Sequence, residues 1–258
     1  MKKYLISIEQ ENSPRLAAFF SQTTFKNYKN EFKQFGIIGA DFPSAEYFKL
    51  AVAGKERPLS PAELGCTLSH MSAVRDFLKS DDDYACIFED DAQSLEHIDL
   101  DALESQVQAL HLKSGFFLML GGIQLSLNRQ IRGKILTQKL FSTQVLSIHP
   151  YYYDKLSYAY AYVIDRQMAQ YLIQYHEQPQ LYDHWNKFEQ HGLQPHFYAS
   201  FLFDHPDLDD CTLNNSYLST ERSTLTEIRS RKRTRLDRFK NSILKRLYKF
   251  MLQLYSRH

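Results

Sequence analysis

The stretch SPAELGCTLSHMSAVRDFLKS, residues 60–80, followed by YACIFEDDA at residues 84–92, decides the fold class. Ser60, Pro61 and Glu63 give the start signal of a helix, with an N-cap, a first-turn proline and an S-x-x-E capping box. Apolar residues then recur at helical spacing and form one stripe: Leu64, Leu68, Met71, Val74 and Leu78. The sequence therefore predicts a helix that leads into a short, fully buried strand.

Further short apolar segments lie on both sides of this helix and strand. Residues 4–8, 116–120 and 157–165 have the composition of buried strands, and the last of them leads into a helix with Asp165 as its N-cap. Between the first strand and the helix at residues 60–80, we expect a mostly helical stretch from Arg15 to about Phe35, then a strand at Ile37 and Ile38 bracketed by glycines. Strands alternating with helices predict an α/β fold, with a mainly parallel central sheet flanked by helices.

Composition and charge exclude several classes of protein. The 258 residues are 43% hydrophobic and 24% charged, which excludes disorder over the whole chain. No apolar run reaches the roughly 18 residues of a membrane-spanning helix. The net charge of +1 hides an asymmetry, because residues 229–258 carry +10 and residues 1–228 carry −9. We therefore expect one catalytic-size domain over residues 1–228 and a distinct basic tail over residues 229–258.

The basic tail has an apolar stripe of its own. Its members recur at helical spacing among the cations: Leu236, Phe239, Ile243, Leu244, Leu247, Phe250, Met251 and Leu254. This pattern predicts a C-terminal basic amphipathic helix that lies on a membrane surface. A helix packed on the acidic body is the alternative. We expect no nucleic-acid partner, because an acidic body repels phosphate and nucleic acid leaves the apolar stripe unexplained.

The cysteines and the glycine motifs narrow the choice further. Cys66, Cys86 and Cys211 are too widely spaced for a disulfide framework or a cysteine zinc motif, which favours a reducing cytosol. The G-x-S-x-G, P-loop and dinucleotide-binding patterns are all missing from the sequence. Serine hydrolases, P-loop NTPases and dinucleotide enzymes are thereby disfavoured.

An acidic triplet stands where ligands of α/β sheets bind. Glu89, Asp90 and Asp91 directly follow the buried strand at residues 84–88, and such sheets bind ligands beyond the carboxyl ends of their strands. Mg²⁺ or Mn²⁺ is the natural counter-charge, and either ion stabilises a departing phosphate. The alternative is a solvated acidic turn.

Three other features are candidates for contacts with a ligand or substrate. His70 lies on the flank of its helix, where it either reaches a ligand or is a structural histidine. Asp183, between Tyr182 and Trp185, is either a general base or an exposed helix N-cap. Alternating tyrosines that include Tyr160 and Tyr162 suit a sugar, or are one face of a strand.

Two segments together resemble the signature of glycosyltransferase family 25, the bacterial lipooligosaccharide glycosyltransferases. These are ELGCTLSH at residues 63–70 and IFEDDA at residues 87–92. Four further segments keep the family's order: YLISIEQENSPR (4–15), FGIIGAD (35–41), AYVIDRQMAQYLI (161–173) and YDHW (182–185). The resemblance covers roughly residues 1–218. One departure is Ser7, where family members commonly have Asn, although a serine hydroxyl can still bond a nucleotide.

The resemblance implies a GT-A fold and an inverting transfer from a UDP-hexose, with galactose favoured over glucose, to a lipooligosaccharide. It also implies Mn²⁺ or Mg²⁺, with Asp91 as the direct ligand, Glu89 beside the metal or the ribose, and His205 as a further metal or diphosphate partner. The donor side implied is Ser7, Ile8, Arg15, Gly39, Ser69, His70, Glu89, Asp90, Gly121 and Gly122. The acceptor side implied is Tyr160, Tyr162 and Trp185, with Asp183 as the catalytic base.

Two rival functions remain at this point. The chain is either an enzyme on the cytoplasmic face of the inner membrane, held there by its tail, or a catalytically silent sugar- or lipid-binding module of the same fold. A nucleotidyltransferase is disfavoured, because the chain lacks a Gly- and Lys-rich loop for a triphosphate.

Overall fold

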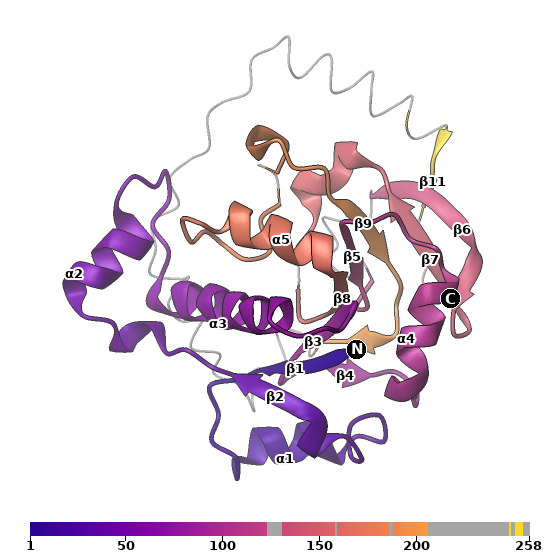
Figure 1. Ribbon diagram of the computed structural model, residues 1–258, viewed down its shortest axis with the longest axis horizontal. Coiled ribbons are helices and arrows are strands. Elements are labelled where there is room, and N and C mark those ends of the chain that lie inside the picture. Colours follow the sequence, from indigo (N-terminus) through magenta and orange to yellow (C-terminus); the bar gives the residue numbers. More distant parts are fainter. Residues whose placement is uncertain (123–130, 158, 186–187, 206–247, 249–250, 255–258) are drawn as a thin grey trace.

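A nine-stranded sheet forms the centre of the protein, in the order β11-β6-β7-β9-β5-β8-β3-β1-β2 (Figure 1). The computed structural model describes residues 1–122, 131–157, 159–185, 188–205, 248 and 251–254. The strands of the sheet are β1 (Lys2–Ile6), β2 (Phe32–Phe35), β3 (Tyr84–Glu89), β5 (Phe116–Met119), β6 (Arg132–Leu140), β7 (Thr143–Ile148), β8 (Ala161–Asp165), β9 (His196–Ala199) and β11 (Gln253–Leu254). Two short strands, β4 (Gln93–Ser94) and β10 (Phe203–Asp204), pair separately.

The α-helices are α1 (Pro14–Ser21), α2 (Ser44–Tyr47), α3 (Pro61–Leu78), α4 (Leu100–Ala109) and α5 (Arg166–Tyr175). Shorter helical segments are η1 (Lys29–Glu31), η2 (Gly39–Asp41), η3 (Phe48–Val52), η5 (Pro150–Lys155) and η6 (Phe188–His191).

The sheet is mixed, so the expectation of a mainly parallel sheet is wrong. Among the strand pairs of the described residues, only β1–β2, β1–β3 and β5–β9 are parallel, and β8 runs antiparallel between β3 and β5. The cause of the error is that all five residues of β8 are buried, as in a parallel sheet. Helices cover both faces of β8, so its apolar composition carries no information on its direction.

Alternate residues of the central strands enter two separate cores, one on each face of the sheet. In β3, Ile87 belongs to one core and Phe88 to the other. α3 and α5 contribute to the first core, whereas α1 and α4 contribute to the second (Figure 1). The sheet is therefore sandwiched between two helical layers, which confirms the α/β class.

Helix α3 begins as the sequence predicts. The Ser60 hydroxyl accepts a bond from the Glu63 amide at 3.1 Å, and the Glu63 carboxylate accepts one from the Ser60 amide at 3.0 Å. The buried face of α3 is wider than the expected stripe and includes His70, which is 0% exposed. The helix has this wide buried face because it contacts α5 and η2 as well as the sheet.

The region between β1 and α3 differs from its prediction. The expected helix from Arg15 to about Phe35 is only the eight residues of α1, and the strand is β2, which ends before Ile37. β2 is an outer strand whose two middle residues are polar and exposed. Because such a strand has no run of buried apolar residues, its sequence was predicted as part of the helix. The strand ends at Phe35, and at the next residue, Gly36, a Cβ atom would lie 2.0 Å from the Ser7 carbonyl oxygen.

Most of the basic tail, including the proposed boundary at residue 228, lies outside the described residues. Where the tail is described, it contacts the body: the Tyr248 ring lies 4.4 Å from that of His149, and the Arg132 guanidinium donates to the Leu252 carbonyl at 3.1 Å. Leu254, expected on a helix, is in β11 and pairs with Arg132 of β6. This end of the tail therefore packs on the sheet.

Within the described residues, no helix is both long enough and apolar enough to cross a membrane.

Candidate functional site

The carboxyl ends of four strands meet at one edge of the sheet. β1, β3, β5 and β9 run in the same direction, while β8 runs the opposite way and begins at that edge. This topology gathers Ser7 after β1, Asp91 after β3, Gly121 after β5, Tyr160 before β8, and His205, which follows β9 and the short strand β10. The predicted acidic triplet therefore lies at an edge to which five segments contribute.

Asp90 is held by Ser7 and Arg15. The Ser7 hydroxyl donates to Asp90 Oδ2 at 2.5 Å, and Arg15 Nε donates to Asp90 Oδ1 at 2.5 Å. Arg15 stands in the first turn of α1, which Ser13 caps through the Leu16 amide at 3.2 Å. Burial raises the pKa of Asp90 to about 6, because it outweighs the Arg15 charge and the Ser7 hydrogen bond.

Asp91 lies between two basic side chains. Its Oδ2 atom is 3.1 Å from Arg15 Nη2 and 3.2 Å from His205 Nε2. Burial acts to raise the pKa of Asp91, but the His205 hydrogen bond and the charges of His205 and Arg15 lower it below its ordinary value. Asp91 Oδ1 is buried, and no group in the described part of the chain donates a hydrogen bond to it.

The free lone pairs of Asp91 Oδ1 fit a divalent cation. A buried carboxylate oxygen without a donor is costly, and hard cations such as Mg²⁺ and Mn²⁺ take oxygen ligands. Asp91 and His205 are the side chains of the predicted metal set that are in contact. Glu89, the third member, is turned away and bonds His70 instead.

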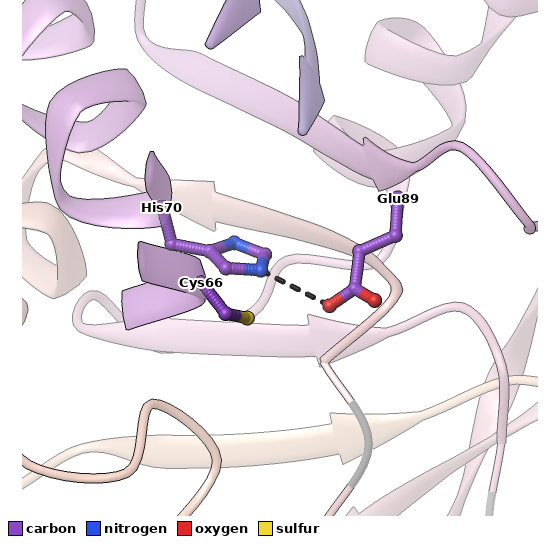
Figure 2. Close-up of side chains that lie close together, drawn as sticks. All are labelled: Cys66, His70 and Glu89. Atoms are coloured by element: carbon purple, nitrogen blue, oxygen red, sulfur yellow. Dashed lines mark hydrogen bonds and ion pairs between the residues drawn. The ribbon is translucent and has the colours of Figure 1, made fainter. Parts of the chain in front are cut away.

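Glu89 belongs to a second cluster, with Cys66 and His70 (Figure 2). His70 Nε2 is 3.1 Å from Glu89 Oε1, and His70 Nδ1 is 2.9 Å from the Tyr162 hydroxyl. The Tyr162 hydroxyl is in turn 2.7 Å from that of Tyr182. The neighbouring residues Glu89 and Asp90 thus serve two different networks.

Gly39 and Ser69, expected on the donor side, lie where the start of α3 meets η2. The Ser69 hydroxyl donates to the Gly65 carbonyl at 2.7 Å and accepts from the Ile37 amide at 2.8 Å. A Cβ atom on Gly39 would lie 1.8 Å from the Pro61 carbonyl oxygen, so only glycine fits there. Both residues thus hold η2 against α3. Their contacts with a sugar donor stay predictions.

Tyr160 and Gly121 lie next to His205. The Tyr160 hydroxyl donates to the Phe203 carbonyl at 2.9 Å, and the Tyr160 and His205 rings meet edge to face at 5.2 Å. A Cβ atom on Gly121 would lie 2.2 Å from the Tyr160 hydroxyl oxygen. Gly122 follows with a φ angle of 63°, a conformation that favours glycine. These contacts hold the segment that carries His205.

The predicted acceptor side chains are buried. Tyr160 and Tyr162 are 2% and 0% exposed, and Trp185 is 1% exposed and packs on Phe117 and Phe197. Asp183 is half-buried in a turn after Tyr182. Its role as base and the acceptor roles of the three rings stay predictions.

The remaining donor candidate, Ile8, is 51% exposed and follows Ser7. The loop after it borders a cavity of about 450 Å³, lined by Glu9, Gln10, Glu11, Asn12 and Ser13. These lining residues stand between Ser7 and Arg15 in the sequence.

Two contacts of the site were not predicted from the sequence: the proximity of Cys66 to His70, and the bond between Tyr182 and Tyr162. Cys66 and His70 are four residues apart on one helix, a spacing that puts both on one face and signals their proximity. Tyr182, by contrast, reaches Tyr162 only through the fold, and its position in the chain gives no signal of that contact.

The class of protein that this sheet edge and its acidic site fit is a glycosyltransferase. A family model described as glycosyltransferase family 25 (LPS biosynthesis protein) matches residues 1–185, so the chain belongs to this family. The match contains both signature segments and ends at Trp185. No curated protein matches the chain.

Proposed function

We propose that the protein transfers a hexose, galactose in preference to glucose, from a UDP-sugar to a lipooligosaccharide acceptor with inversion at the anomeric carbon. A divalent ion, Mn²⁺ or Mg²⁺, assists the transfer in a GT-A fold. Membership of the family supports a sugar donor and a lipopolysaccharide acceptor. The UDP carrier, the choice of galactose, the inversion and the metal are proposed in addition to what family membership supports.

The observation that carries the proposal is Asp91 Oδ1. This atom is buried without a hydrogen-bond donor among the described residues, at the edge of the sheet where nucleotides of α/β proteins bind. Asp91 and His205 would hold the ion, which when bound neutralises the charge that develops on a departing diphosphate.

Arg15 and Ser7 organise the donor side. Arg15 contacts both Asp90 and Asp91, so it fixes the two carboxylates relative to α1 and balances their charge. Ser7 bonds Asp90 with its hydroxyl, and the Glu9 amide donates to the same hydroxyl oxygen at 3.1 Å. The Asp90 carboxylate is suited to accept a hydrogen bond from a ribose hydroxyl.

The acceptor side requires a base. Inversion in one displacement needs a group on the far face that takes the proton of the attacking hydroxyl. Asp183 is proposed for this step because it is a half-buried carboxylate beyond the Tyr162–Tyr182 contact, outside the Asp90–Asp91 pair.

The basic tail is proposed to hold the enzyme on the cytoplasmic face of the inner membrane, where a lipid-linked acceptor lies. Its net charge of +10 attracts an anionic leaflet, and each cation near the surface contributes on the order of 1 kcal/mol.

A UDP-release assay tests the proposal. The protein is incubated with several UDP-sugars and an acceptor, with Mn²⁺ and then with EDTA. We expect UDP from one sugar, UDP-galactose first, and none after chelation. Failure to release UDP with any donor and acceptor would favour the alternative, a catalytically silent sugar- or lipid-binding module.

A further inference from the structure

Cys66, His70 and Glu89 bring a thiol, an imidazole and a carboxylate together beside the proposed donor site. One ligand atom from each side chain lies within 4.8 Å of the other two, and in the described residues no other group of three such side chains does so. Figure 2 shows Cys66 and His70 on the same helix and Glu89 facing them from the end of its strand. Two ligands one helical turn apart and a third on a rigid strand make a preorganised arrangement.

The spacing suits a four-coordinate ion. Bond lengths of about 2.0–2.3 Å in a tetrahedral zinc site separate its ligand atoms by roughly 3.3–3.6 Å. His70 Nε2 and Glu89 Oε1 are already 3.1 Å apart. A small increase in the distance between these two atoms makes room for an ion that both of them bind. Three protein ligands leave a fourth position for water or a substrate atom.

The surroundings of His70 are those of a metal ligand. A ligating histidine normally donates its second ring N–H to a neighbouring acceptor, which fixes the tautomer. His70 Nδ1 has this partner in the Tyr162 hydroxyl at 2.9 Å, and Tyr162 can donate onward to Tyr182 at 2.7 Å. The His70 ring also stacks on Tyr182 at 4.1 Å, which fixes its plane.

Charge and access agree with this reading. Glu89 forms its ion pair with His70, and within the described residues its carboxylate contacts no Lys or Arg side chain. Its side chain is 28% exposed, while that of His70 is 0% exposed. An ion can therefore reach the cluster from the Glu89 side and meet a carboxylate that a cation would neutralise.

We infer that Cys66, His70 and Glu89 form a Zn²⁺ site, distinct from the Mn²⁺ or Mg²⁺ site proposed at Asp91. A thiolate with an imidazole selects zinc over the hard ions that prefer oxygen. Binding displaces the thiol proton, so the affinity rises with pH. This inference does not depend on the proposed transfer reaction, and it is tested without an activity assay.

The experiment is a Co²⁺ titration of the full-length, reduced protein after removal of metals by a chelator. Co²⁺ bound to a thiolate gives an intense near-ultraviolet charge-transfer band. We expect one equivalent of Co²⁺ to produce this band and Zn²⁺ to abolish it. Cys66→Ser should lose the band, whereas Cys86→Ala, Cys211→Ser and Asp91→Asn should retain it.

A measurement on the unaltered chain covers the case in which Cys66→Ser does not fold. Zn²⁺ should protect Cys66 from alkylation, as read from its peptide by mass spectrometry, and Mg²⁺ should not. Absence of both the Co²⁺ band and the Zn²⁺ protection, or a band that survives in folded Cys66→Ser, would overturn the site and leave an ordinary His–Glu hydrogen bond.

Tyr162→Phe tests the role of the second ring nitrogen. Loss of an outer partner of a ligating histidine weakens metal affinity by about 10–100-fold. We expect that weakening for Zn²⁺ in Tyr162→Phe, with the thiolate band of Co²⁺ unchanged in shape. Unaltered affinity would show that Tyr162 serves only the fold.

Discussion

Asp91 is the residue on which the proposed metal dependence rests. Asp91→Asn keeps the size of the side chain but removes the charge that faces Arg15 and His205. We expect UDP release to fall by a factor on the order of 100 or more, because a metal supplies several kcal/mol of charge stabilisation. The far-ultraviolet circular dichroism should stay unchanged. The matched control is Glu46→Gln, an exposed acid on α2 that should retain full activity.

Asp90 gives a pH-dependent prediction for stability. Its pKa is about 6 in the folded protein, above the ordinary value of 3.8, so the folded state binds more protons than the unfolded state between these values. Stability contributed at this residue is therefore present at low pH and is lost as the pH rises through about 6. Ionised Asp90 costs roughly 3 kcal/mol at pH 8.

Asp90→Asn should remove that cost. We expect its free energy of unfolding in urea to exceed that of the unaltered chain at pH 8, and the difference to shrink toward pH 4. UDP release should decrease at both pH values, because the proposed ribose contact is lost. An Asn variant that is equally destabilised at both pH values would contradict the burial argument.

The sequence predicted the members of this site better than their grouping. Ser7, Arg15, Asp91 and His205 were expected near the donor or the metal, and the fold brings them together. The separation of Glu89 from Asp91 was not foreseen. Adjacent residues at the end of a strand point in different directions, and which partner each one meets depends on helices elsewhere in the chain.

At the scale of elements, the start of α3 is the most direct link between sequence and stability. Ser60→Ala removes one half of the capping box at a residue that is 2% exposed. We expect the free energy of unfolding to fall by about 1 kcal/mol. Ser72→Ala, in the same helix and only half-buried, should change it by less than about 0.5 kcal/mol. Equal effects of the two changes would contradict a stabilising role of the capping box.

The elements that the sequence predicted are those whose local signals agree with their tertiary setting. α3 has a capping box and an apolar stripe, and β3 is a short apolar run with both faces covered. β2 was misplaced because an outer strand needs no apolar pattern on its exposed side. The antiparallel placement of β8 could not be predicted, because strand direction depends on pairing with β3 and β5.

At the scale of the whole molecule, the charge asymmetry predicts binding to anionic lipid. Replacement of Arg229, Arg231, Lys232, Arg233 and Arg235 by Gln removes half of the tail's net charge of +10 and leaves residues 248–254 intact. We expect co-sedimentation with phosphatidylglycerol vesicles to fall sharply, since each cation contributes on the order of 1 kcal/mol. Activity on a soluble acceptor should persist. Phosphatidylcholine vesicles are the control, and undiminished binding to the anionic vesicles would refute the electrostatic role.

Because β11 pairs with β6, a C-terminal truncation would expose one side of β6, which the charge replacement does not do. β11 occupies the backbone hydrogen-bonding groups around Arg132 and Gly133, while farther along β6 a register shift and the exposed charge of Lys139 interrupt a regular edge. Unpaired edges of this kind recruit strands from other molecules. A chain cut before Gln253 should therefore self-associate slowly at high concentration, visible by light scattering, even in the absence of lipid. We therefore expect β11 to limit pairing between molecules at this strand of the sheet.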